Sequence, residues 1–355
     1  MKFSSLFITL ALLLLPVSLM AQRLTAHRGT VSQAYNYWFY VPSPNPQPGA
    51  VTVPPVLPDS DSWEDGDLQI ATDRKPLVIF LHGASLCGNN LAKVRRYGTV
   101  DALAKGLKLD SYVMAPQNPG GAWNPTKINR IVDWALSKYS IDSTRIYVLG
   151  MSLGGYGTID YAAASPERVA AALALCGGGT SKTLGNLNQV PLCILHGTGD
   201  RAVPWQASQS VVNAMLAAGD TTRLIYRLLP KQSHGALARY FYVPEVYDWL
   251  FQHSLADSAR YVRRDFRFGL QLPESVYRQL EKPKQPLLVE DSKKGIERDD
   301  YKGKGSTATT GVHVVRKGDT LGHIAKQHRT TVAHLCQVNK ISRTSTLRIG
   351  QKIRY

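Results

Sequence analysis

Cysteine is scarce in this chain, which contains four among 355 residues. The four positions match no recognisable disulfide framework, and no group of cysteines and histidines has the spacing of a zinc site. Cys176 and Cys193 lie at the end of, or within, apolar strand-like runs, so both are expected to be buried free thiols. The sequence therefore gives no sign of a disulfide-stapled scaffold and predicts no metal site.

Apolar runs that could enter a membrane are also lacking, except near the start of the chain. Residues 6–15 are apolar, Lys2 precedes them, and Pro16 and a polar sequence follow. This run is too short for a comfortable transmembrane helix, and no cysteine follows closely enough to carry a lipid. We predict a signal peptide over 1–21 and an exported protein (periplasmic, cell-wall associated or secreted) with no stable transmembrane anchor. An uncleaved N-terminal anchor is the alternative.

Acidic residues are outnumbered by basic ones, 26 to 42, which gives a net charge of +16. The excess is greatest in residues 312–355, which carry nine Lys or Arg and one Asp. A basic balance can indicate nucleic-acid binding, but an exported protein more often meets acidic polymers of the cell envelope. We therefore expect no nucleic-acid partner, and solubility alone is the alternative reason for the charge.

Residues 76–253 contain an alternation of strand-like and helix-like segments. Short apolar runs typical of buried strands alternate with segments of helical periodicity. This alternation predicts an α/β fold with a mostly parallel sheet flanked by helices, and right-handed crossovers place the loops after the strands along one sheet edge. Strands are predicted over 31–41, 76–81, 112–115, 145–149, 169–176, 191–196 and 223–229, and helices over 101–108, 128–139, 155–164, 207–218 and 240–253.

The length suggests about two domains, and the composition changes after the last predicted helix. Dense charge over 281–304 is followed by a run of small Ser, Thr, Ala and Gly residues, as in a flexible tether. We assign 1–21 to the signal peptide, 22–254 to the α/β domain, 255–311 to a linker and 312–355 to a small C-terminal domain.

A candidate nucleophile follows the predicted strand 145–149, where residues 150–154 read Gly-Met-Ser-Leu-Gly and a helix-compatible run follows. A serine hydroxyl is a poor nucleophile unless the backbone exposes it and a base takes its proton. The flanking glycines permit a strained turn from strand to helix that lifts the hydroxyl out of the sheet. We therefore predict Ser152 as the nucleophile.

The base and the carboxylate that such a serine needs are found further along the chain. Asp200 ends a Gly-Thr-Gly-Asp loop after the strand 191–196, and His234 lies in a Ser-His-Gly loop before the last helix. The order Ser152, Asp200, His234 is the one expected for an α/β-hydrolase. We predict these three as catalytic residues.

Three other histidines are alternatives for the base. His82 and His196 adjoin strand ends, where they are better explained as residues that shape loops. His253 ends a helix and is expected to be exposed. None of the three combines a late position, small neighbours and a preceding strand, as His234 does.

The oxyanion of an acyl-transfer intermediate needs two backbone N–H donors. In an α/β-hydrolase one comes from the loop after the first buried strand and the other from the residue after the nucleophile. We therefore predict the N–H groups of Ala84 and Leu153. Trp123, after another strand, is expected either to line the substrate pocket or simply to pack beneath a loop.

These segments together resemble α/β-hydrolases of the phospholipase/carboxylesterase type, closest to the secreted "predicted peptidase" and polyhydroxybutyrate-depolymerase-like esterases. The resemblance covers residues 76–252 and implies ester hydrolysis through an acyl-serine intermediate, with no cofactor. It is specific for the fold and for serine chemistry, and weak on the substrate. The matching residues are 80–84, 141–148, 150–157, 176–179, 196–200 and His234.

Residues 312–355 have the pattern of a very small domain with a strand, two short helices and a closing strand, β-α-α-β. Over its whole length this segment resembles a LysM module, most distinctively in 318–321 and 347–353. The resemblance implies binding of a glycan that contains N-acetylglucosamine, such as peptidoglycan or chitin; a LysM fold that no longer binds glycan is the alternative. The family's binding loops fall on Gly318, Asp319, Thr320 and Leu321, and on Asn339, Lys340 and Ile341.

The function that these observations favour is an exported serine esterase held at cell-wall glycan by its LysM module. Acyl groups on glycans are plausible ester substrates, because the second module recognises glycan. One alternative is a serine peptidase of the prolyl-oligopeptidase type, although only about 75 residues precede the first core strand and leave no room for a large N-terminal propeller. The other is a noncatalytic peptidoglycan-binding protein.

Overall fold

The computed structural model divides into two compact units, Met1–Tyr301 and Lys302–Tyr355, and each is described by itself. None of the helices in the described part of the chain is long and apolar enough to cross a bilayer. The predicted signal peptide, residues 1–21, lies outside the described residues. The structure describes residues 22–42, 74–265, 268–269, 272–280, 287–291, 295–299, 312–316, 318–328, 330–339, 341–342, 345 and 347–355.

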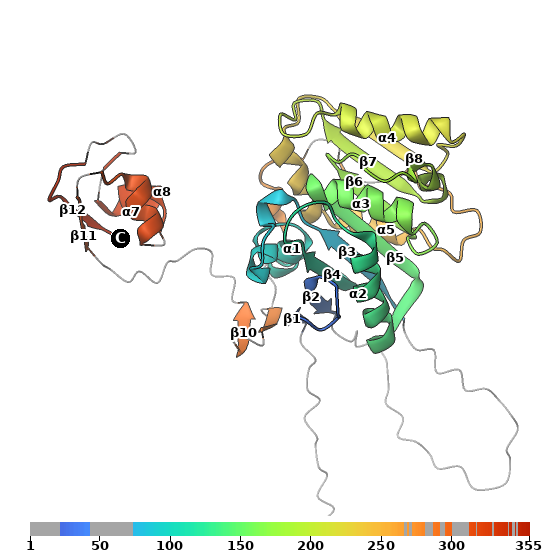
Figure 1. The fold of residues 1–355 in the computed structure, drawn as a ribbon, viewed down its shortest axis with the longest axis horizontal. Helices are drawn as coiled ribbons and strands as arrows, with labels where there is room; N and C mark the ends of the chain where they lie inside the picture. Colours follow the sequence, from blue (N-terminus) through green and yellow to red (C-terminus); the bar gives the residue numbers. More distant parts are fainter. Residues whose placement is uncertain are drawn as a thin grey trace, which may run out of the picture. The chain divides into compact units, whose positions relative to one another are not determined.

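The described part of the first unit is built on a ten-stranded sheet with the order β10-β9-β1-β2-β4-β3-β5-β6-β7-β8 (Figure 1). The six strands from β4 to β8 pair in parallel, whereas β1, β2 and β4 pair antiparallel. The strands are β1 (Arg23–His27), β2 (Asn36–Val41), β3 (Lys75–Leu81), β4 (Tyr112–Gln117), β5 (Ile141–Met151), β6 (Ala171–Leu175), β7 (Leu192–Gly197), β8 (Leu224–Leu229), β9 (Leu287–Asp291) and β10 (Gly295–Asp299).

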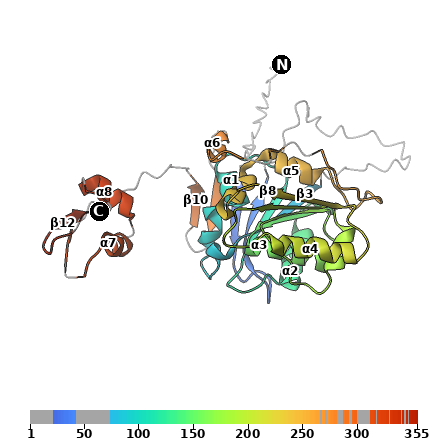
Figure 2. The same cartoon turned by 90° about the horizontal axis from the view of Figure 1, so that it is seen from above.

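Helices cover both faces of this sheet, and Figure 2 shows α2, α3 and α4 on one face and α1 and α5 on the other. The central strands are therefore buried on both sides, which explains their continuous apolar sequences. Along β3, Val78 and Phe80 join the core beneath α1 and α5, whereas Leu77 and Ile79 join the core beneath α2, α3 and α4. The helices are α1 (Thr99–Ala104), α2 (Pro125–Lys138), α3 (Leu153–Ala164), α4 (Gln206–Ala217), α5 (Pro244–Phe251) and α6 (Val276–Gln279).

The predicted mostly parallel sheet flanked by helices is confirmed, and the carboxyl ends of its parallel strands share one edge. The predicted strands and helices over 76–253 recur with shifts of a few residues at their ends. The aromatic run over 31–41 supplies only β2, and the neighbouring strand β1 lies further toward the N-terminus.

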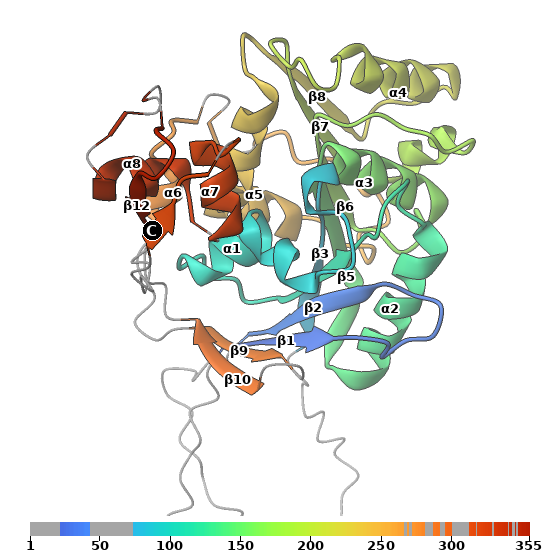
Figure 3. The ribbon, with the colours of Figure 1, turned by 60° about the vertical axis from the view of Figure 1, so that its left-hand side comes forward.

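The predicted linker over 255–311 needs a correction, because two strands lie within it (Figure 3). β9 pairs in parallel with β1, and β10 pairs antiparallel with β9. Leu287 and Val289 are buried in the core, and an Arg28 Nη2–H group donates to Asp291 Oδ2 at 2.8 Å. This segment is dense in charge, so its composition suggested a tether. Its strand partner lies about 260 residues earlier in the chain, where no local pattern could show it. The domain boundaries themselves remain predictions.

The second unit has the predicted order of strand, two helices and strand. β11 (Val312–Val314) pairs antiparallel with β12 (Lys352–Arg354), and α7 (Leu321–Gln327) and α8 (Val332–Asn339) lie between them in the sequence. Six buried residues form its small core: Val315, Leu321, Ile324, Ala325, Leu335 and Ile353.

Candidate active site

The turn from β5 to α3 has the strained form that the sequence predicts. Ser152 stands between the last residue of β5 and the first of α3, with φ 60° and ψ −124°. Positive φ in a residue with a side chain costs on the order of 1–3 kcal/mol and persists only where the surroundings enforce it. A Cβ added at Gly150 would collide with the backbone of Gly154, and one at Gly154 with the carbonyl oxygen of Leu81. The two glycines therefore let this turn pack tightly against the end of β3.

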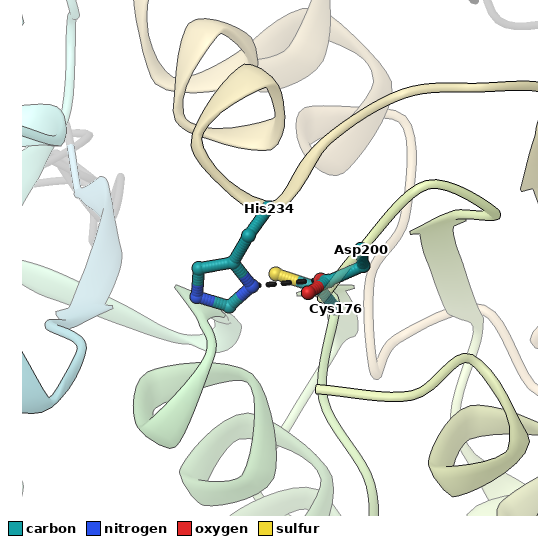
Figure 4. A group of neighbouring side chains, drawn as sticks. All are labelled: Cys176, Asp200 and His234. Carbon is teal, nitrogen blue, oxygen red and sulfur yellow. Dashed lines mark hydrogen bonds and ion pairs between the residues drawn. The ribbon is translucent and has the colours of Figure 1, made fainter. Parts of the chain in front are cut away.

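Asp200 and His234 meet at the same sheet edge, as Figure 4 shows. His234 Nδ1–H donates to Asp200 Oδ2 over 2.7 Å. The Asp200 side chain is fully buried, whereas the His234 side chain is 26% exposed. Asp200 therefore fixes the tautomer of the imidazole, and the second ring nitrogen, Nε2, is left available to act as a base.

The Asp200 carboxylate is held ionised by its hydrogen bonds. Its Oδ1 accepts from the backbone N–H groups of Ala202 at 2.8 Å and Val203 at 2.9 Å. Burial opposes ionisation, but the bonds from Val203, His234 and Ala202 outweigh it and lower the pKa of Asp200 below its ordinary value. The site therefore presents a buried negative charge to the imidazole.

The loops that carry these two residues are bound to each other. Thr198 N–H donates to Leu229 O at 2.9 Å, Gly199 N–H donates to Gln232 O at 3.1 Å, and Lys231 N–H donates to Thr198 Oγ1 at 2.9 Å. These bonds join the loop after β7 to the loop after β8. They therefore hold the carboxylate and the imidazole in a fixed relative position.

Cys176 links the serine turn to the acid and base pair. Ser152 N–H donates to Leu175 O at 2.9 Å, and Cys176 is the next residue. The Cys176 sulfur, a carboxylate oxygen of Asp200 and a ring nitrogen of His234 all lie within 4.8 Å of one another. The structure thus brings the serine turn and the predicted pair to one place. The buried thiol was expected, but nothing in the sequence pointed to its position beside Asp200.

These same three atoms are of a kind that can bind a metal ion, but their chemistry does not favour that role. Burial and the nearby Asp200 carboxylate raise the pKa of the Cys176 thiol, whereas a metal needs the thiolate. Asp200 and His234 already satisfy each other. The arrangement therefore fits a proton relay better than a metal centre.

The predicted oxyanion donors both start short helices. Leu153 is the first residue of α3, and Ala84 is the first residue of the 3₁₀ helix η1 (Ala84–Leu86). The first N–H groups of a helix have no acceptor within it, so they can bind an anion. A Cβ added at Gly83 would lie 3.4 Å from Ser152 Cβ, which places this loop against the serine.

Tyr97 positions this loop through a contact that no local sequence pattern predicts. Gly83 N–H donates to the Tyr97 hydroxyl at 2.8 Å. The tyrosine lies 14 residues further along the chain, so only the folded structure shows the contact. The oxyanion role of Ala84 and Leu153 remains a prediction.

His82 and His196 shape loops, as expected. Both are fully buried. Burial lowers the pKa of His82 to about 4, and its Nδ1–H donates to Gly83 O at 2.8 Å while Nε2 accepts from Asn118 N–H at 3.0 Å. His196 lies 2.7 Å from the Ser208 hydroxyl through Nδ1. Each therefore links the end of a strand to a neighbouring segment.

His253 and Trp123 are both buried, which contradicts the prediction for His253 and decides between the two interpretations of Trp123. His253 is only 4% exposed, because the chain folds back over it and Arg263 N–H donates to its Nε2 at 3.0 Å; the prediction of an exposed histidine is wrong. Trp123 is 4% exposed and packs edge-on against Tyr35, and a Cβ added at Gly157 would collide with its ring. This favours packing beneath a loop over a pocket wall.

The side chains predicted to bind glycan are largely occupied within the second unit. The Asp319 carboxylate accepts from Arg316 N–H and from His313 Nε2–H, both at 2.8 Å. Thr320 Oγ1 accepts from His323 N–H at 3.1 Å. These side chains therefore hold the loop and helix start in shape.

In the second predicted glycan loop, the Asn339 side chain is also bonded within the unit. Asn339 Nδ2 donates to Arg354 O at 2.7 Å, and its Oδ1 accepts from Arg354 N–H at 2.8 Å. Leu321 is in the core, and Gly318 has φ 92° in the turn before it. Ile341, with Ser345, Arg348 and Gln351, lines an open hollow of about 700 Å³. Lys340 lies outside the described residues.

Known proteins resemble each of the two units. Residues 313–354 match the LysM domain family. Acetylxylan esterase A of Aspergillus awamori is 37% identical over 82 residues, which are 23% of this chain and 26% of that enzyme. A thermostable esterase of known structure is 24% identical with a TM-score of 0.47, over 66% of this chain and 64% of its own. A mutant feruloyl esterase module from Clostridium thermocellum, complexed with sinapinate, is 15% identical with a TM-score of 0.44, over 64% of this chain and 88% of its own.

The chain thus spans about a quarter of the acetylxylan esterase and just under two thirds of the thermostable esterase. The fold rests on this structure itself: a mostly parallel sheet, a strained serine turn after β5, Asp200 in the loop after β7, and His234 at the start of the 3₁₀ helix η4 (His234–Tyr242) after β8. The chain joins a domain with an α/β-hydrolase fold to a C-terminal LysM domain.

Proposed function

We propose that the chain is an exported serine hydrolase that cleaves carboxylic esters through an acyl-serine intermediate. The observation that carries the proposal is the 2.7 Å bond between Asp200 and His234 at the sheet edge where Ser152 occupies a strained turn. The short stretch of identity with an acetylxylan esterase supports ester chemistry. The three residues have the roles of a serine triad.

In the reaction, Ser152 Oγ attacks the ester carbonyl carbon while His234 Nε2 takes the hydroxyl proton. The Asp200 carboxylate stabilises the imidazolium that forms. The N–H groups of Ala84 and Leu153 stabilise the oxyanion, and loss of one such donor costs roughly 2.7–4 kcal/mol in the transition state. The imidazolium then protonates the departing alcohol. Water, deprotonated by His234, then attacks the acyl carbon, and the imidazolium returns the proton to Ser152 Oγ as the acid leaves.

The LysM domain gives the enzyme its location. We propose that it binds N-acetylglucosamine-containing glycan such as peptidoglycan, and that the substrates include acyl groups carried by glycans. The occupied side chains of Asp319, Thr320 and Asn339 favour glycan contacts through backbone groups and through the hollow beside Ile341.

A substrate panel with wild type and Ser152→Ala tests the proposal. We expect wild type to hydrolyse short acyl esters, including acetylated xylan fragments, and the variant to lose this activity by about 10⁴-fold or more. Faster cleavage of peptides than of esters would favour the prolyl-oligopeptidase-type alternative. Equal activity of the two proteins would remove Ser152 from the chemistry, and no activity in either would favour a noncatalytic glycan-binding protein.

A further inference from the structure

The wall beside His234 carries positive charge. An open groove of about 740 Å³ is lined by His234 together with Arg201, Lys231, Thr198 and Ser233. None of its lining residues bears a carboxylate. The Asp200 carboxylate is fully buried and bonded to the imidazole. The groove therefore presents two cations and two hydroxyl groups next to the proposed base.

Both cations are available to a ligand. Arg201 and Lys231 are exposed, and within the described residues neither side chain forms an ion pair or a hydrogen bond. Guanidinium and ammonium groups bind carboxylate or phosphate by charge-assisted hydrogen bonds. Such bonds are available here without breaking an existing pair.

The backbone also points to this place. Lys231 has φ 59°, a conformation that glycine adopts freely and that is costly for a residue with a side chain. The conformation is enforced because Lys231 N–H donates to Thr198 Oγ1 at 2.9 Å and the next residue binds Gly199. A lysine is therefore present in a turn that favours glycine, beside the proposed catalytic base.

We propose that Arg201 and Lys231 form a subsite for an anionic group of the substrate, so that esters with a carboxylate or phosphate near the scissile bond are preferred. This rests on the proposed function, because the subsite adjoins His234. The anion could lie on the acyl side, as in a half-ester of a dicarboxylic acid, or on the alcohol side, as in an acylated uronic acid.

Two matched substrate pairs test the subsite and distinguish its two sides. The acyl-side pair is 4-nitrophenyl butyrate and 4-nitrophenyl hemisuccinate; the alcohol-side pair is acetylated glucose and acetylated glucuronate. Rates are corrected for spontaneous hydrolysis, and the readout is the ratio of kcat/KM for the anionic ester to that for the neutral ester. We expect a ratio of about ten or more in at least one pair, which falls as salt is added.

The variants are Arg201→Gln, Lys231→Gln and the double variant, with Lys231→Gly as a second form that relaxes the backbone. Each single change is expected to lower the ratio by about three-fold, the effect of one exposed charge pair, and the double variant to bring it near one. Arg227→Gln is the control: Arg227 is exposed on β8 and does not line the groove, so this change leaves the ratio as it was.

A ratio near or below one in both pairs, or a ratio that the double variant leaves unchanged, would overturn the subsite while serine-dependent hydrolysis stands. Absence of any hydrolysis that depends on Ser152 would overturn the proposed function and the subsite together.

Discussion

The sheet edge with the proposed catalytic residues and the predicted glycan loops of the LysM domain use their polar side chains in opposite ways. At the sheet edge, His234 keeps one ring nitrogen free while Asp200 holds the other. In the LysM loops, the Asp319 side chain binds Arg316 N–H and the His313 ring, and the Asn339 side chain binds the backbone of Arg354. The proposed function would therefore use side-chain chemistry in the first region, and the shape and backbone of the loops in the second. Variants that change one region and spare the other test this contrast.

Loss of the base is expected to have the largest effect. His234→Ala should reduce kcat for a short acyl ester by about 10⁴-fold to 10⁶-fold, because it removes the group proposed to take the Ser152 proton. KM and retention on insoluble peptidoglycan should change little. Steady-state kinetics and a pull-down measure the two properties. A loss of less than about ten-fold with the fold intact would assign the base elsewhere.

Removal of residues 312–355 should have the converse effect. We expect the shortened protein to leave the peptidoglycan pellet for the supernatant, while kcat/KM for a soluble ester stays within about two-fold, because the LysM unit has its own core. The full chain with Ser152→Ala is the matched control, which should stay in the pellet. Retention of the shortened protein would place glycan binding in the α/β domain.

An added methyl group in the serine turn should lower the free energy of unfolding. Gly154→Ala places a Cβ against the Leu81 carbonyl oxygen, and overpacking of this kind costs about 3 kcal/mol. Gly235→Ala is the control, because nothing lies within 4 Å of a Cβ there. Chemical denaturation should show the difference in the free energy of unfolding. Equal stability of the two variants would mean that the close approach of β3 and α3 is not required.

Acidification should reveal a smaller effect through Asp200. Its pKa is lowered in the folded protein, so its ionised form adds stability above the ordinary carboxyl pKa of about 4, and this stability is lost as the pH falls through the lower folded value. The stability difference between wild type and Asp200→Asn should therefore shrink as the pH falls from 5 toward 2. Denaturant midpoints at several pH values measure it; a difference that grows on acidification would contradict the assignment.

Local patterns were enough to predict the strained serine turn, the parallel sheet and the placement of Asp200 after β7 and His234 after β8. They succeeded because each depends on neighbours in the sequence or on a general rule of chain crossover. β9, Tyr97 and the place of Cys176 were missed because each depends on a contact between distant segments. The prediction that His253 is exposed was wrong for a similar reason, because the segment that covers it, around Arg263, comes after α5 in the chain.

Trapping of the nucleophile tests the central claim most directly. The full chain, treated with a fluorophosphonate ester and digested, should carry one phosphonyl adduct on Ser152, and His234→Ala should suppress its formation. Mass spectrometry locates the adduct. Wild type that hydrolyses esters but carries the label on another residue, or on none, would contradict the account.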